Sequence, residues 1–243
     1  GRVTFPAAMA SVDLDRDLKN DLVIVGRMPV TGKGAGNVLL ADKMGGFSSD
    51  SFSEVASLQA VATLDADEDG VPDLVYGSQT ANQQSFVTVQ LGDGAGRFRS
   101  RVDHQACAPA LTIGVGDVNG DGHADLVIGC PNGLYLSRLL GDGRGGFAQT
   151  PGIPIGIGLT GLVVADLNGN SMADIAVVTA NNEIAIYEWN EDPGRANLRI
   201  AGIPVDSPGA MAGGDFDGDA WMDLALVNQK TATVSIWFNR LKP

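Results

Sequence analysis

The sequence is poor in basic residues, cysteines and aromatic side chains, and it has no long apolar run. Sixteen Lys and Arg stand against 29 Asp and Glu, giving a net charge of −13. This balance argues against a nucleic-acid partner, because phosphate binding depends on basic surface. No apolar run reaches the roughly 18 residues of a membrane-spanning helix, so we expect no membrane insertion. Two cysteines are too few for a disulfide scaffold.

The chain is rich in glycine and apolar residues instead. It has 33 glycines and 11 prolines, and 44% of its residues are hydrophobic. Many glycines and few long runs of helix-favouring residues are typical of short strands joined by tight turns. The composition therefore favours an all-β fold.

An acidic nine-residue cluster recurs five times along the chain. Its copies are DLDRDLKND (13–21), DADEDGVPD (65–73), DVNGDGHAD (117–125), DLNGNSMAD (166–174) and DFDGDAWMD (215–223). The successive offsets are 52, 52, 49 and 49 residues, a period typical of repeat architectures. Each cluster follows a small or apolar segment and precedes two apolar runs and a glycine-rich turn, so each repeat is expected to form four short strands.

A four-stranded unit cannot bury both of its faces alone, so the repeats must pack against one another. We predict a single domain over residues 1–243, a β-propeller of about five four-stranded antiparallel blades with the acidic cluster between strands 1 and 2. A closed ring is preferred to a solenoid because neither end resembles a polar cap. The fifth repeat ends after its third strand, and only residues 1–5 remain to supply a fourth.

Positions 1, 3, 5 and 9 of each cluster carry side-chain oxygens, the spacing with which a tight loop wraps a hard cation such as Ca²⁺. Position 7 would contribute its backbone carbonyl. The predicted side-chain ligands are Asp13, Asp15, Asp17, Asp21, Asp65, Asp67, Asp69, Asp73, Asp117, Asn119, Asp121, Asp125, Asp166, Asn168, Asn170, Asp174, Asp215, Asp217, Asp219 and Asp223. The predicted carbonyl ligands are Lys19, Val71, His123, Met172 and Trp221.

An EF-hand begins with a similar pattern but needs a glutamate at position 12 and flanking helices. Position 12 here is apolar in every copy: Ile24, Tyr76, Ile128, Val177 and Leu226. The EF-hand interpretation therefore fails. Position 6 should favour glycine, because the chain reversal there requires a positive φ. Only the second and third clusters have a glycine at this position, Gly70 and Gly122.

Seventeen of the 29 acidic side chains occupy the predicted ligand positions of these clusters. Up to five bound Ca²⁺ ions would bring the net charge from −13 to about −3, so calcium is expected to stabilise the fold. The second cluster should bind most tightly. The fourth, which starts at Asp166 and has Asn168 and Asn170, should bind most weakly.

The sequence resembles the FG-GAP and VCBS repeat family, which includes the propeller of integrin alpha subunits and certain fungal propeller lectins. The motif DxDxDGxxD followed by Leu or Ile matches at 65–74 and at 117–126, and the FG and GAP elements survive in part at 46–47, 96–98 and 146–147. The resemblance implies structural calcium in each blade and a ligand bound elsewhere. It also implies six or seven blades in most members, whereas this chain has five repeats.

If the acidic clusters occupy one end of the blades, the loops joining strands 2 to 3 and 4 to 1 form the opposite end. These loops are rich in Asn, Gln, Ser and Thr, side chains that hydrogen-bond sugar hydroxyls, and binding residues are often on such loops. We predict a non-catalytic, secreted or cell-surface recognition module that binds a glycan, or alternatively an extracellular protein. No signal peptide precedes Gly1 in this sequence. Apolar loops such as 153–159 are candidates for the protein alternative.

An enzyme is the second class considered, because some five-bladed propellers resemble glycoside hydrolases, which need two carboxylates about the scissile bond. The acids outside the clusters, such as Glu54, Asp103 and Asp206, lie on different repeats, and His104 has no evident triad partners. We therefore predict no catalysis. Trp189 and Trp237 are expected to pack inside blades, and Trp221 to pack at a rim or to present its ring outward.

Cys107 precedes the first strand of the third repeat, and Cys130 ends its second strand. Both lie at the end of the blade away from the acidic cluster. A disulfide between them is feasible, with two buried thiols as the alternative, because the sequence does not supply the Cα separation.

Overall fold

The structure is a computed structural model that describes residues 3, 5–28, 33–42, 44–55, 57–80, 82, 84–106, 112–130, 134–155, 158–189 and 196–240. Over these residues the chain forms nineteen strands and no helix, so the predicted all-β class is confirmed. No described segment is a helix long and apolar enough to cross a membrane.

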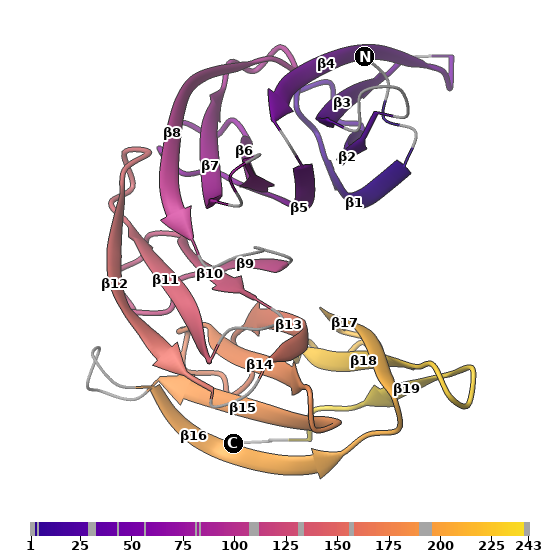
Figure 1. The fold of residues 1–243 in the computed structure, drawn as a ribbon, viewed down its shortest axis with the longest axis vertical. Coiled ribbons are helices and arrows are strands. Elements are labelled where there is room, and N and C mark those ends of the chain that lie inside the picture. The colour runs from indigo at the N-terminus through magenta and orange to yellow at the C-terminus, as the bar shows by residue number, and fades with distance from the viewer. Residues whose placement is uncertain are drawn as a thin grey trace. The chain divides into compact units, whose positions relative to one another are not determined.

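The strands form five antiparallel sheets in chain order, the predicted blades of a β-propeller (Figure 1). Blade 1 comprises β1 (Phe5–Val12), β2 (Asp21–Arg27), β3 (Gly34–Ala41) and β4 (Phe47–Val55). Blade 2 comprises β5 (Ser57–Leu64), β6 (Asp73–Gln79), β7 (Ser85–Gly92) and β8 (Phe98–Ala106). Blade 3 comprises β9 (Thr112–Gly116), β10 (Asp125–Gly129), β11 (Tyr135–Gly141) and β12 (Phe147–Pro154). Blade 4 comprises β13 (Leu159–Ala165), β14 (Asp174–Thr179), β15 (Glu183–Trp189) and β16 (Ala196–Pro204).

Blade 5 has three strands rather than four. They are β17 (Pro208–Gly214), β18 (Asp223–Asn228) and β19 (Thr233–Trp237), in the order β17-β18-β19. Nothing among the residues that the structure describes pairs with the outer edge of β19. These three strands agree with the sequence expectation for residues of the fifth repeat up to Pro243.

The chain divides into two compact units. Unit 1 comprises residues 1–113 and 141–149, and unit 2 comprises 114–140 and 150–243, so the division passes through blade 3. In unit 1 the first strand of blade 2, β5, packs across β1, β2 and β3. In unit 2 the first strands pack likewise, β13 against both β10 and β17. In each unit the first strand of a blade thus packs against strands of an adjacent blade.

The second strands of the blades are the most buried. The five residues of β10 and the six of β14 are all buried, because both faces of these central strands are covered. In unit 1 the core gathers Val23, Val25, Leu74 and Tyr76. In unit 2 the larger core cluster includes Val127, Ile175 and Val177 together with Ile153, Ile155 and Leu159.

The large apolar side chains of segment 153–159 that the structure describes are buried. Ile153, Ile155 and Leu159 are 7%, 8% and 3% exposed and belong to the core of unit 2. The interpretation of this stretch as an exposed apolar loop was wrong. Sequence alone did not show that the end of β12 folds back onto β13 and β14.

A turn built around one aspartate joins the third and fourth strands of blades 1, 2 and 3. Asp42, Asp93 and Asp142 each accept two backbone N–H groups from within the turn, at 2.7 to 3.1 Å. The backbone N–H groups of Gly46 and Met44 hold the pKa of Asp42 below its usual value. Backbone N–H donors lower the pKa values of Asp93 and Asp142 for the same reason. These are the glycine-phenylalanine turns noted in the sequence.

The same turns connect one blade to the blade before it. Gly96 donates its N–H to the carbonyl of Leu14 at 3.2 Å, and Gly145 donates to the carbonyl of Ala66 at 2.8 Å. Both acceptors are at position 2 of the preceding acidic cluster. A glycine is required at Gly96 because φ is +74° and a Cβ would lie 2.5 Å from Leu40. The turns of blades 2 and 3 therefore hold the acidic loop of the preceding blade in place.

Substituting this glycine should separate backbone strain from the contact between blades. We expect Gly96→Ala to destabilise unit 1 by about 2 to 4 kcal/mol, combining a positive φ with a clash against Leu40. Gly45 is the matched control, since it occupies the same place in the blade 1 turn, has φ +82° and would place a Cβ in open space. Gly45→Ala should cost only the strain, about 1 to 2 kcal/mol. Urea unfolding followed by circular dichroism measures both; equal losses would show that the contact with Leu40 is unimportant.

Candidate functional site: five acidic loops

The acidic clusters are the loops between the first and second strand of each blade. We call residues 13–21, 65–73, 117–125, 166–174 and 215–223 loops 1 to 5. Each loop begins directly after the first strand, and its position 9 aspartate is the first residue of the second strand. The predicted placement of these clusters in the blade is thus what the structure shows.

The aspartate at position 9 is buried in every loop. Its exposed fraction is 0 or 1% in all five copies: Asp21, Asp73, Asp125, Asp174 and Asp223. In every copy one carboxylate oxygen accepts the N–H of position 2, at 2.7 to 3.0 Å. In loops 1, 2 and 5 the other oxygen accepts an N–H from the end of the third strand or just beyond it, from Ala41, Gly92 and Asn239. One carboxylate therefore ties the loop to two strands.

Positions 1 and 5 organise the rest of the loop. The position 1 carboxylate accepts N–H groups from positions 5 and 6 in loop 2, as Asp65 does from Asp69 and Gly70. The position 5 side chain accepts the N–H of position 7 in all five loops, at 2.8 to 3.0 Å. The loop is thus wrapped around side-chain oxygens at positions 1 and 5 that accept its own backbone N–H groups.

Two positions of each loop have a positive φ. Position 6 does so in every copy, as expected, although three copies carry a side chain there: Leu18 (65°), Ser171 (67°) and Ala220 (69°). Position 4 also does so in every copy, at Arg16, Glu68, Gly120, Gly169 and Gly218. Sequence reasoning missed position 4, although the glycines of loops 3, 4 and 5 were the available signal.

Three of the loops bring carboxylates close enough to share one cation. The groups, whose ligand atoms all lie within 4.8 Å of one another, are Asp13 with Asp15 and Asp17, Asp65 with Asp67 and Asp73, and Asp215 with Asp217 and Asp223. Removal from water and the charges of Asp21 and Asp17 raise the pKa of Asp15. Burial likewise raises the pKa of Asp73, and desolvation with the charges of Asp219 and Asp223 raises that of Asp217. These loops therefore concentrate negative charge that their backbone N–H groups offset only in part.

Loop 2 contains an oxygen that its hydrogen bonds do not explain. Oδ1 of Asp67 is buried and has no hydrogen-bond partner. A buried carboxylate oxygen without a donor is costly unless a cation balances it. Asp67 is at position 3, and its neighbours Asp65 and Asp73 lie within the same 4.8 Å group. The donor set of loop 2, all carboxylate oxygen, fits a hard divalent cation such as Ca²⁺.

Loop 4 is organised differently. Asn168 donates its side-chain N–H to Asp174 at 3.2 Å, and Asn170 accepts from Met172. Position 3 of this loop thus supplies its own hydrogen-bond donor to the position 9 carboxylate. A cation bound by this loop would have to displace the hydrogen bond from Asn168 to Asp174.

Basic side chains lie beside several of the predicted ligands. Lys19 lies 3.3 Å from Asp17, Arg99 3.6 Å from Asp69, and Arg240 3.5 Å from Asp217. All three pairs have exposed partners, so each contributes little by itself. They reduce the repulsion among the carboxylates of loops 1, 2 and 5.

Neighbouring loops also contact each other through their side chains. Trp221, at position 7 of loop 5, lies so close to Gly169 of loop 4 that a Cβ there would be 2.5 Å from the ring. Trp221 therefore packs at the rim, one of the two predicted placements. Trp237 packs within blades 4 and 5 as expected, and the Trp189 side chain lies outside the described residues.

The acids considered for catalysis have structural partners. Asp103 accepts hydrogen bonds from Thr88 at 2.7 Å and from Arg101 at 3.0 Å. Asp206 lies 3.2 Å from Lys230, and burial lowers the pKa of His104, whose ring contacts Phe147. The Glu54 side chain lies outside the described residues.

Cys130 is buried at the end of β10 and is disulfide-bonded. Among the described residues there is no free cysteine. The chain has one other cysteine, Cys107, which lies outside the described residues.

Comparisons with known proteins agree with this fold and repeat. The family model of the FG-GAP-like repeat matches residues 65–128 and 117–177, which contain loops 2, 3 and 4. A chain from the crystal structure of BBS1N in complex with ARL6DN, soaked with lead, is similar over 98% of this chain and 80% of that one, with a TM-score of 0.58 and 10% identity. The comparison with curated proteins found no match. The match to residues 65–177 and the five-bladed β-propeller are consistent with an FG-GAP β-propeller family, as the sequence resemblance indicates.

Relieving the strain at position 6 should stabilise the protein. Leu18 has a positive φ and is 93% exposed, so its side chain contributes no packing that would be lost. We expect Leu18→Gly to stabilise unit 1 by up to about 1 kcal/mol, because glycine adopts this conformation without a Cβ penalty. Leu18→Ala keeps the Cβ and should leave the stability of unit 1 unchanged. Denaturant midpoints compare the two variants, and a destabilised glycine variant would contradict the expectation.

Proposed function

We propose that the chain is a calcium-stabilised, non-catalytic extracellular recognition module that binds a glycan at the end of its blades opposite the acidic loops. The observation that carries the calcium part is loop 2, with its three clustered carboxylates and the buried, unpartnered oxygen of Asp67. Calcium is a structural ion in this proposal. It would neutralise the loops and hold the first and second strands of each blade together.

The residues that would hold Ca²⁺ are those at positions 1, 3, 5 and 9, with the position 7 carbonyl. Loops 1, 2 and 5 each have four acids at the ligand positions, whereas loop 4 has two. Affinity should follow this order, since the ion is attracted by ligand charge and loop 4 already has an internal donor to Asp174.

The recognition surface is supported by how polar groups are distributed along the blades. The acidic side chains of the loops lie at one end of the blades, and the turns at the other end expose amides and hydroxyls beside charged residues such as Lys230 and Asp206. In unit 2 Asn181, Asn182, Gln229 and Thr231 are exposed at the β14–β15 and β18–β19 turns. Backbone bonds from Gln229 to Ser207 and from Val205 to Asn182 hold these turns in place. Amide and hydroxyl groups on a fixed scaffold are suited to hydrogen-bonding sugar hydroxyls.

Calcium should raise the melting temperature. We expect a rise of at least several degrees between excess chelator and millimolar Ca²⁺, since the ion binds the folded chain and not the unfolded one. The calcium-induced rise in melting temperature should be smaller in Asp67→Asn, because loop 2 then lacks one ligand charge. Asp50→Asn, on exposed strand β4 away from the loops, is the matched control and should keep it. A melting temperature that is the same with and without chelator would refute calcium stabilisation.

Glycan binding is tested separately. A glycan array probed with the purified chain in millimolar Ca²⁺ should give reproducible signal on one class of sugar, and chelator should reduce it. Asn181→Ala and Gln229→Ala should weaken the signal while leaving the melting temperature unchanged. A blank array with a folded, calcium-loaded chain would instead favour the alternative, a module that binds an extracellular protein.

A further inference from the structure

The outer strands of blades 1 and 2 enclose a pocket within unit 1 that has both charged and apolar walls. Its volume is about 250 Å³, and none of its lining residues is a predicted calcium ligand. A cavity of this size holds a small organic molecule rather than a polymer. The lining side chains that matter here are Val38, Asp50 and Phe52 of blade 1 and Gln90, Arg97 and Phe98 of blade 2.

Gln90 is a polar exception at a place in the repeat that is otherwise apolar or aromatic. It pairs with Leu74, the residue directly after the position 9 aspartate of loop 2. Oε1 of Gln90 is buried and has no hydrogen-bond partner. A buried amide oxygen without a donor is costly, so a donor from a bound molecule would stabilise it. The residues at the same register in the other blades are Leu39, Leu139, Tyr187 and Trp237.

Asp50 is the corresponding exception on the blade 1 side of the pocket. It pairs with Val38 on β3, which in turn pairs on β2 two residues beyond the position 9 aspartate. The same two pairings lead to Val102 in blade 2 and to Ile200 in blade 4. The Asp50 carboxylate accepts the N–H of Ser51 and forms no ion pair with a described residue.

Arg97 is the third exception, directly before the phenylalanine that begins the fourth strand. The turns of blades 1 and 3 have a glycine at this place, Gly46 and Gly146. Asp93 of the same turn accepts the backbone N–H of Arg97, and the guanidinium forms no ion pair with a described carboxylate. The walls of the pocket therefore have one acidic and one basic side chain that do not pair with each other.

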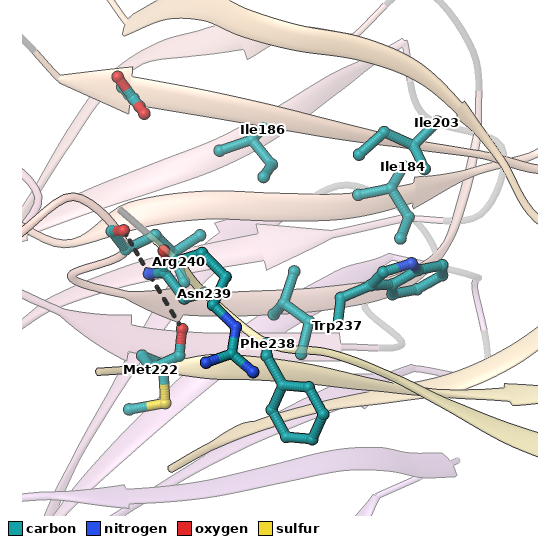
Figure 2. A pocket seen from close by; sticks show the side chains of 11 residues that line it. Ile184, Ile186, Ile203, Met222, Trp237, Phe238, Asn239 and Arg240 are labelled. Atoms are coloured by element: carbon teal, nitrogen blue, oxygen red, sulfur yellow. Dashed lines mark hydrogen bonds between the residues drawn. The ribbon is translucent and has the colours of Figure 1, made fainter. Parts of the chain in front are cut away.

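The gap between blades 4 and 5 shows the apolar form of the same place. There Ile186 and Trp237 occupy the positions that correspond to Val38 and Gln90 (Figure 2). Other blades thus form the same strands with apolar side chains or glycine where this pocket has charges and an amide. The fold itself does not require the three polar side chains, which indicates that they bind something.

The chemistry of the pocket matches a small zwitterion that also has an apolar group. A guanidinium binds a carboxylate through paired N–H donors. An ammonium group has three N–H donors, which suit the Asp50 carboxylate and the unpartnered oxygen of Gln90. The rings of Phe52 and Phe98, with centroids 6.1 Å apart, supply an apolar wall beside these groups.

We propose that the pocket between blades 1 and 2 binds a free α-amino acid with an apolar side chain. Arg97 binds its carboxylate, Asp50 and Gln90 bind its ammonium, and the two phenylalanine rings contact its side chain. This site is distinct from the predicted calcium loops and from the proposed glycan surface, and it depends on neither.

Isothermal titration calorimetry on the full chain tests the class of ligand. The probes are L-valine, L-leucine, L-methionine and L-phenylalanine, each titrated separately, and at least one should bind saturably. Acetylating the amino group of that ligand removes its ammonium, and amidating it removes its carboxylate. Each change should weaken binding at least about tenfold, because it removes a charge-assisted contact.

Variants of the chain test the assigned residues. Gln90→Leu and Arg97→Gly introduce residues that the repeat already has at these places, so the fold should be retained. Each should weaken binding at least about tenfold, and Gln90→Leu should also raise the melting temperature, since it removes a buried oxygen without a partner. Asp50→Asn should weaken binding while keeping the calcium response. The matched control is Arg144→Ala, an exposed arginine in the corresponding turn of blade 3 and outside the pocket, which should bind as the wild type does.

Four results would overturn the proposal. The first is that none of the four amino acids binds the wild-type chain. The second is that the acetylated and amidated ligands bind as well as the free one. The third is that Gln90→Leu and Arg97→Gly bind as the wild type does, which would place the ligand elsewhere. The fourth is that a neutral sugar such as glucose binds in place of the amino acids and loses its binding in Gln90→Leu.

Discussion

The buried carboxylate at position 9 is the interaction on which each blade depends. In blade 2 Asp73 begins the second strand, accepts the N–H of Ala66 and accepts the N–H of Gly92. These bonds join three strands at one point and satisfy backbone groups that would otherwise be buried without partners. An apolar side chain there would leave both donors unsatisfied. The acidic residue is thus required by the backbone before any cation is considered.

This role explains why the acidic loops tolerate so much charge. The backbone N–H groups of each loop converge on its carboxylates, so part of the negative charge is already balanced without metal. The balance is incomplete in loop 2, where Asp67 retains a buried oxygen without a donor. A cation would complete it there. Loop 4 instead uses the amide of Asn168, so the loops need not share one affinity or one ion content.

The sequence predicted the repeat, the strands and the loop positions because each is a local pattern repeated five times. It did not predict the positive φ at position 4, where Arg16 and Glu68 give no sign of it. It also missed the bond from Gly96 to Leu14, since a contact between blades depends on how two repeats pack. The burial of Ile153 and Ile155 was missed for the same reason. The sequence therefore predicted features within one repeat but not the contacts between repeats.

Blade 5 makes the contact with the preceding loop through a different chemical group. Blades 2 and 3 lock the preceding loop with a glycine N–H from the turn between the third and fourth strands. Blade 5 ends β19 without such a turn, and the side chain of Asn239 donates to the carbonyl of Leu167 at 2.7 Å instead. The acceptor is again position 2 of the preceding loop. A side-chain amide thus takes the place of a backbone donor in the contact between blade 5 and blade 4.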